Sequence, residues 1–270
     1  YLYGDAGIDT ITGGASEPNR IEGGDDDDTI TGGADRDIAL GQAGDDEIAT
    51  LGGNDAVIGG ADDDRLNGGD DDDILIGGDG GDEVFGNAGD DVLFVIDVSL
   101  GAEFSEQPWS GGVNDLYDGG AGEDLIVVND DIDITLSNIN LQMSVYGNHT
   151  AGNIEVAHLT GGASANTIDA AGFSGRTIIR GKGENDILRG GSDTDVIEGG
   201  DGDDTITANA GNDTITGGAG TNTLTGGHDD DTYVFNDITA IDTVLESAAG
   251  GDDRLDLNAV SSDLTLAVGD

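Results

Sequence analysis

The sequence has no cysteine, two prolines and one tryptophan, and only 8 Lys and Arg residues stand against 58 Asp and Glu residues. Without cysteine, the chain has neither disulfides nor thiolate metal sites. The net charge of −50 argues against direct binding to nucleic acid or to an anionic membrane. No stretch approaches the roughly 18 consecutive apolar residues of a membrane span. Aromatic residues make up 4% of the chain, so we expect a thin, aliphatic core.

Recognisable catalytic motifs are also lacking. None of the three histidines, His149, His158 and His228, belongs to an H-E-x-x-H zinc-protease motif. The segment GFSGR at 172–176 comes nearest to a nucleophile elbow, but Arg176 stands where the motif needs a second glycine. Neighbouring carboxylates occur along the whole chain, so their pairing does not point to glycoside hydrolysis. We therefore predict that the chain is not an enzyme.

Glycine and aspartate are abundant instead, with 50 glycines and 47 aspartates against 11 glutamates. They recur with a period of nine. Ten units run from Gly4 to Phe94, among them GGDDDDTIT, GGADDDRLN and GGDDDDILI, and six more run from Gly181 to Val234. Position six is Asp in nine of the first ten units, with Asn19 in the exception, and position eight is apolar.

The period predicts how each unit folds. Glycines at positions one, two and four are expected to supply the positive φ angles of a tight turn, and the last three residues are expected to form a short strand. Position eight then faces a core, and positions seven and nine face outward. Two units make one coil of 18 residues, and successive coils stack roughly 4.8 Å apart. The position-six aspartates would form a repulsive ladder, which a divalent cation between turns would neutralise.

The unit resembles the RTX (hemolysin-type) calcium-binding nonapeptide repeat, G-G-x-G-x-D-x-U-x, over more than half of the chain. The resemblance implies an all-β fold, a parallel β-roll or β-solenoid, whose six-residue turns bind several Ca²⁺ ions. It implies that the metal ligands are the position-six aspartates, which are Asp9, Asp28, Asp37, Asp46, Asp55, Asp64, Asp73, Asp82, Asp91, Asp124, Asp186, Asp195, Asp204, Asp213 and Asp231.

The repeat pattern divides the chain into four predicted segments. A first β-roll block covers 1–94, and a strand-rich spacer with degenerate units covers 95–180. A second β-roll block covers 181–234, and capping strands follow at 235–270. The spacer contains the only tryptophan, Trp109, and recovers the repeat briefly around Asp115. The chain opens with Tyr1 and is already within a repeat at Gly4, which suggests a piece of a longer polypeptide.

Several units carry an acidic residue at position four, where the repeat has glycine. Along each side of the predicted roll, no two successive turns carry one. The extra carboxylates are therefore two coils apart, roughly 10 Å, which is close to the Debye length at physiological salt. Either this spacing limits repulsion, or it records the duplication of a four-unit segment.

These observations predict a calcium-binding structural module that folds on binding Ca²⁺. The resemblance implies an extracellular or cell-surface setting in bacteria, in an adhesin-like or matrix protein exported by type I secretion. Two alternatives to this prediction remain open. In the first, the chain is a subunit of an extracellular filament or surface layer that self-associates through solenoid edges. In the second, it is a non-catalytic module of a secreted RTX enzyme or toxin. The expected partners are calcium ions and a surface, matrix or self-associating partner.

Overall fold

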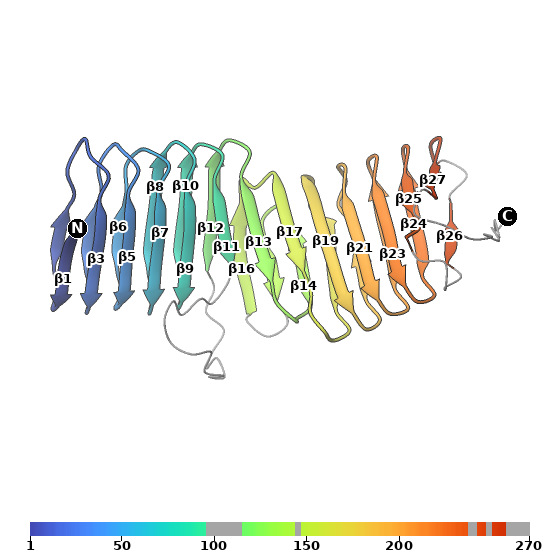
Figure 1. Ribbon diagram of the computed structural model, residues 1–270, viewed down its shortest axis with the longest axis horizontal. Coiled ribbons are helices and arrows are strands. Elements are labelled where there is room, and N and C mark those ends of the chain that lie inside the picture. The colour runs from blue at the N-terminus through green and yellow to red at the C-terminus, as the bar shows by residue number, and fades with distance from the viewer. Residues whose placement is uncertain (96–114, 144–146, 237–241, 247–249, 258–270) are drawn as a thin grey trace. The chain divides into compact units, whose positions relative to one another are not determined.

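The computed structural model describes residues 1–95, 115–143, 147–236, 242–246 and 250–257 (Figure 1). Every regular element in these ranges is a β-strand, as the nine-residue period predicts. In this part of the chain there is accordingly no helix that is long and apolar enough to cross a membrane. The predicted break in the period around Trp109 lies outside the described residues. The chain forms two compact units, unit 1 (Tyr1–Val128 and Tyr146–Val156) and unit 2 (Asn129–Val145 and Ala157–Asp270).

Unit 1 is a parallel β-solenoid whose strands alternate between two sheets (Figure 1). One sheet has the order β1-β3-β5-β7-β9-β11-β13 and the other the order β2-β4-β6-β8-β10-β12-β16. The strands are β1 (Leu2–Ala6), β2 (Thr10–Thr12), β3 (Arg20–Asp25), β4 (Thr29–Thr31), β5 (Ile38–Ala43), β6 (Glu47–Ala49), β7 (Ala56–Ala61), β8 (Arg65–Asp70), β9 (Ile74–Asp79), β10 (Glu83–Ala88), β11 (Val92–Val95), β12 (Leu116–Ala121), β13 (Leu125–Asn129) and β16 (Gly147–Gly152).

Unit 2 repeats this plan, with the strand orders β17-β19-β21-β23-β25-β27 and β15-β14-β18-β20-β22-β24-β26. Only β14 and β15 pair in an antiparallel manner among the described strand pairs of this unit. The strands are β14 (Ile134–Ser137), β15 (Leu141–Met143), β17 (Val156–Thr160), β18 (Thr167–Gly172), β19 (Arg176–Gly183), β20 (Ile187–Arg189), β21 (Val196–Asp201), β22 (Thr205–Ala210), β23 (Thr214–Ala219), β24 (Thr223–His228), β25 (Thr232–Val234), β26 (Thr243–Leu245) and β27 (Arg254–Asp256).

The register of the repeats confirms the predicted coil of two units. Leu75 pairs with Val57 on one side and with Leu93 on the other, each 18 residues away. All three side chains are fully buried, and so are the other apolar residues at position eight from Ile21 onward. Ile11, in the first coil, is half-buried. The outward assignment of position seven also holds, since Ile74 is 45% exposed next to buried Leu75.

Two local expectations were wrong. Most repeat strands have six residues rather than three, because hydrogen bonding continues through positions one to three of the next unit, as in Ile74–Asp79. Positive φ occurs at positions two and four but not at position one. Position-one glycines serve close packing instead. A Cβ on Gly59 would collide with Oδ2 of Asp64 and come within 2.6 Å of the Gly77 carbonyl oxygen.

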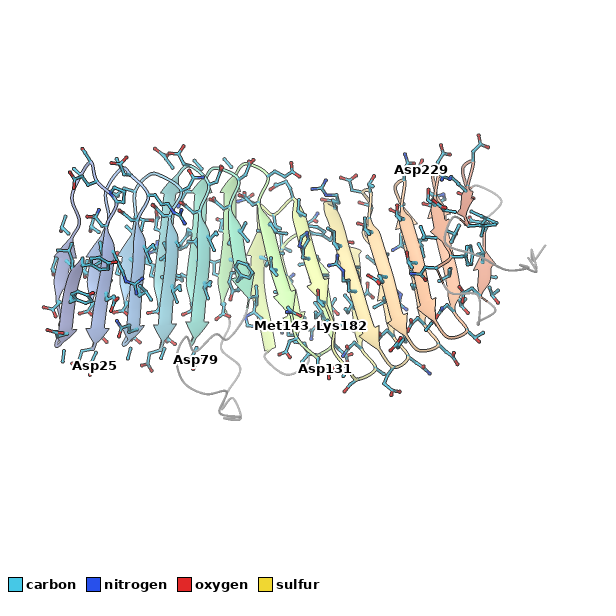
Figure 2. The ribbon with its side chains drawn as sticks, in the orientation of Figure 1. Asp25, Asp79, Asp131, Met143, Lys182 and Asp229 are labelled. Carbon is cyan, nitrogen blue, oxygen red and sulfur yellow. The ribbon has the colours of Figure 1, made fainter. Side chains whose placement is uncertain are left out.

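The division of the chain at residues 94, 180 and 234 remains a prediction. What the structure adds is that the parallel coil continues beyond the first repeat block, through β12 and β13 of unit 1. In both units each coil passes from one sheet to the other through a turn, and the aspartates gather in these turns. Asp25 and Asp79, both at position three, lie along one edge of unit 1 (Figure 2).

Candidate metal centres in the turns

The position-six aspartates form two ladders in each unit, one along each edge. Each main-chain N–H at this position donates to Oδ1 of the position-six residue one coil further on. Asp46 donates to Asp64, and Asp64 donates to Asp82, both at 2.9 Å. On the other edge Asp55 donates to Asp73, and Asp73 donates to Asp91, both at 2.8 Å. One carboxylate oxygen of each residue therefore fixes the stacking of two coils.

The second oxygen of most ladder carboxylates is buried without a hydrogen-bond partner. This holds for Oδ2 of Asp28, Asp46, Asp64, Asp73, Asp82, Asp91, Asp124, Asp186, Asp204, Asp213 and Asp231. Asp55 presents its Oδ2 in the same way; burial raises the pKa of its carboxyl to about 6, against the opposing Asp37 amide and Thr50 hydroxyl. A buried carboxylate oxygen without a partner is strongly unfavourable unless a proton or a cation compensates it.

Burial raises the pKa of several of these carboxyls above the ordinary aspartate value. It raises the pKa of Asp64 to about 8, with the Asp82 and Asp46 carboxylates adding to the effect and the Asp46 amide opposing it. Burial likewise raises the pKa of Asp73 and Asp82 to about 7 in unit 1 and that of Asp213 to about 7 in unit 2. The ladders thus hold charge that the fold by itself does not neutralise.

Most of the unpartnered oxygens lie against position-one glycines of their own turns. A Cβ on Gly68 or on Gly199 would collide with Oδ2 of Asp73 or of Asp204. Glycine at position one therefore lets the carboxylate lie directly against the backbone of its own turn. These turns hold buried carboxylate oxygens without hydrogen-bond partners, which fits a hard cation such as Ca²⁺.

Two predicted ligands, Asp37 and Asp195, differ from the rest. Oδ2 of Asp37 accepts the Gly33 N–H at 2.6 Å, and Oδ2 of Asp195 accepts the Gly191 N–H at 2.6 Å. In both turns neither position two nor position four has positive φ, and the preceding strands, β4 and β20, have three residues. We refer to them as closed turns, because their own backbone occupies the second carboxylate oxygen. Asp9, in the first coil, is half-buried and completes the predicted set.

The ladders include residues that the repeat pattern did not assign as ligands. In unit 1, Asp115 accepts the Asp82 N–H at 3.0 Å, and Nδ1 of His149 lies 3.3 Å from the Asp115 amide nitrogen. Oε2 of Glu155 accepts the Asp124 N–H at 3.1 Å. In unit 2, Asp253 accepts the Asp231 N–H at 3.0 Å. The recovered repeat unit around Asp115 indicates that residue. The other residues follow insertions that break the period, so the period does not predict them.

A second ladder runs along the exposed side of the turns with the opposite polarity. Oδ1 of Asp45, at position five, accepts the N–H of Asp63 one coil further on, at 3.0 Å. Asp45 itself donates its N–H to Asp27, one coil earlier, at 3.0 Å. In unit 2, Asp203 accepts the Thr221 N–H at 2.7 Å. Position five therefore favours Asp and Asn because a short acceptor is needed there, whether or not metal binds.

Outside the closed turns, most acidic residues at position four occupy left-handed backbone. The φ angles of Asp26, Asp62 and Asp71 are 78°, 79° and 75°, a conformation that Asp tolerates better than most residues. Oδ2 of Asp71 accepts the Gly53 N–H at 3.3 Å, one coil earlier. A structural role therefore accounts for Asp71.

Comparison with known families decides how these turns are interpreted. The model of the RTX calcium-binding nonapeptide repeat matches residues 1–17, 16–48, 40–75, 50–84, 58–93, 171–206 and 198–233, together more than half of the chain. The chain belongs to this family. No curated protein matches the chain. RTX repeats bind calcium, and the buried Oδ2 atoms of this RTX chain, which have no hydrogen-bond partners, fit that ion.

Proposed function

We propose that the chain is a calcium-binding structural module that folds when Ca²⁺ binds to its turns. The row of buried Oδ2 atoms without hydrogen-bond partners carries the proposal. At a net charge of −50 the compact state suffers strong self-repulsion, and the ladders concentrate the charge at strand spacing. Each ion cancels two negative charges at the point where the repulsion is greatest.

Calcium acts here on folding rather than on chemistry. The position-six carboxylates are brought together only when coils stack, so the ion binds the folded turns and hardly the unfolded chain. Its binding free energy therefore adds to the free energy of unfolding. Since each coil contacts only its neighbours, one ordered turn prepares the next, and folding should be cooperative along a unit.

We extend the proposal to a secreted or cell-surface setting, in an adhesin-like or matrix protein in which this module is not catalytic. Extracellular calcium modules typically bind at about 10⁻⁴–10⁻³ M, whereas tight cytosolic sites bind at about 10⁻⁹–10⁻⁸ M. A module of the weaker class stays unfolded in the cytosol and folds outside the cell. Isothermal titration calorimetry tests this step, because saturation of every site at about 10⁻⁷ M would contradict it.

The central experiment is a calcium titration of protein stripped of metal with a chelator. Circular dichroism follows strand formation, and small-angle X-ray scattering follows compaction. We expect an expanded, disordered chain without calcium and a cooperative transition to the solenoid with it. Magnesium at equal concentration serves as the control and should be less effective, since it requires strict octahedral geometry and retains its water. A compact, strand-rich apo state at neutral pH that does not change in millimolar calcium would refute the proposal.

A further inference from the structure

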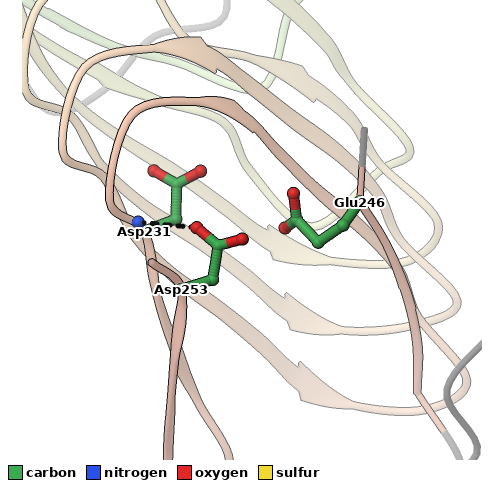
Figure 3. A group of neighbouring side chains, drawn as sticks. All are labelled: Asp231, Glu246 and Asp253. Atoms are coloured by element: carbon green, nitrogen blue, oxygen red, sulfur yellow. Dashed lines mark hydrogen bonds between the residues drawn. The ribbon is translucent and has the colours of Figure 1, made fainter. Parts of the chain in front are cut away.

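The C-terminal end of unit 2 holds three carboxylates that converge from separate parts of the chain (Figure 3). Asp231 precedes β25, Glu246 follows β26, and Asp253 precedes β27. One carboxylate oxygen from each of them lies within 4.8 Å of the other two. Glu246 and Asp253 lie outside every segment that matches the RTX repeat.

The charge of this cluster is not compensated within the described part of the chain. Asp231 is 1% exposed, and its Oδ2 has no hydrogen-bond partner. Burial, together with the Asp253 and Glu246 carboxylates, raises the pKa of Asp231 to about 6 against the opposing Asp213 amide. The nearest basic residue in sequence, Arg254, pairs with Asp256 at 3.1 Å.

The spacing of the three oxygens suits a single calcium ion. Calcium–oxygen distances are about 2.3–2.6 Å, so two ligands on opposite sides of one ion are at most about 5 Å apart. Oxygens that all lie within 4.8 Å of one another can therefore contact the same ion. Two of the three carboxylates are solvent-exposed, which leaves room for water to complete the coordination shell.

Glu246 distinguishes this cluster from the turns of the repeats. Thr223–Thr225 pair with Thr243–Leu245, so Glu246 occupies position one of its turn, directly one coil beyond Gly226. In most repeat units position one is glycine, whereas here a third carboxylate takes that position.

Tyr233 holds Glu246 in place. The Tyr233 hydroxyl accepts the Gly226 N–H at 2.6 Å and donates a hydrogen bond to Oε1 of Glu246. The phenol belongs to a fully buried side chain at position eight, so the glutamate is anchored to the core of the unit. Asp231 and Asp253 are linked in turn by the Asp231 N–H, which donates to Oδ1 of Asp253.

We propose that Asp231, Glu246 and Asp253 bind one Ca²⁺ ion that fastens β26 and β27 to the end of unit 2. The site rests on the proposed function in one respect, since calcium must first fold the repeats that present Asp231. It adds an ion beyond the repeat sites, held by three carboxylates, and it closes the last coils of the unit.

Native mass spectrometry at saturating calcium tests the site by counting ions per chain. The variant Glu246→Gln keeps the size of the side chain and removes its charge, and Asp253→Asn is a second variant that keeps an acceptor for the Asp231 N–H. The matched control is Glu47→Gln, an exposed glutamate on β6. We expect one ion fewer in both test variants and no loss in the control. Circular dichroism should show the same calcium-induced transition of the repeats in all three.

Terbium provides an independent reading, because a tyrosine close to bound Tb³⁺ transfers its excitation energy to the ion. With Tyr233 bonded to Glu246, the tyrosine-excited emission should fall in Glu246→Gln relative to Glu47→Gln. An unchanged ion count in Glu246→Gln and Asp253→Asn, in protein whose repeats fold with calcium, would overturn the site and leave the proposed function intact. A wild-type chain that binds no calcium would overturn both.

Discussion

The main-chain N–H of Asp64 donates a 2.9 Å hydrogen bond to Oδ1 of Asp82, one coil further along unit 1. Oδ2 of both residues is buried and has no hydrogen-bond partner. Such a ladder carboxylate thus uses one oxygen to hold two coils in register and keeps the other buried without a hydrogen-bond partner. Because the two oxygens have different roles, the contributions of coil stacking and of calcium binding to stability can be measured separately.

Replacement of Asp64 by asparagine should weaken calcium binding without breaking the ladder. Asparagine keeps the acceptor for the Asp46 N–H and removes the charge from a turn in the middle of unit 1. We expect the calcium midpoint of folding to rise about tenfold, which corresponds to about 1.4 kcal/mol. The control is Asp9→Asn, which should cause a smaller rise because Asp9 is only half-buried, whereas Asp64 is buried. Equal midpoints in a circular dichroism titration would contradict the prediction.

The closed turns should contribute to stability but not to the number of bound ions. The second oxygens of Asp37 and Asp195 accept N–H groups of Gly33 and Gly191. We expect Asp37→Ala to lower the denaturation midpoint at saturating calcium, because the Asn19 and Gly33 donors lose their acceptor. Its ion count by native mass spectrometry should equal that of the wild type. A lost ion would show that the closed geometry still binds metal.

The orientation of the side chains along β9 predicts that truncating two neighbouring residues lowers the free energy of unfolding by different amounts. Leu75 is fully buried, and Ile74 is 45% exposed. Leu75→Ala should lower the free energy of unfolding by about 2–5 kcal/mol, as is usual when a buried leucine is truncated. Ile74→Ala should cost clearly less, since its side chain keeps much of its contact with water in the folded state. Denaturant unfolding at saturating calcium measures both, and similar values would refute the assignment of facing.

The raised pKa values predict that acid partly replaces calcium. The pKa of Asp64 is about 8 in the folded state, and those of Asp73 and Asp82 are about 7, above the ordinary value of 3.8. The folded state therefore binds protons that the unfolded chain releases. These groups therefore stabilise the calcium-free fold when they are protonated. Their contribution to the free energy of unfolding is fully present below about pH 4 and is lost as the pH rises through about 7 to 8.

Small-angle scattering and circular dichroism in chelator, from pH 8 down to pH 4, test this pH dependence. We expect the calcium-free chain to compact as the pH falls, without full native packing. In the presence of calcium the proton competes with the ion, so the calcium midpoint should rise between pH 8 and pH 6. A calcium-free chain that remains equally expanded over this range would contradict the assignment of uncompensated carboxylates to the folded turns.

The sequence by itself predicted the features of the fold that depend on the nine-residue period. The nine-residue repeat predicted two-unit coils, the burial of Leu66 and Leu75 at position eight, and the stacking of position-six aspartates one coil apart. These features follow from local alternation and from the equal length of successive units, both of which are visible along the chain.

Tertiary structure decided what depends on contacts between coils. Strands of six residues arise from hydrogen bonds to the coils on either side, and position-one glycines are required by the carboxylate and carbonyl oxygens beside them. Glu155 and Asp253 join the ladders after insertions that shift the spacing away from 18 residues. Which aspartates keep an unpartnered oxygen is set by the backbone of each turn. The closed turns keep the glycines at positions one and two and the aspartate at position six that define the repeat, so these positions do not distinguish them, whereas the folded geometry does.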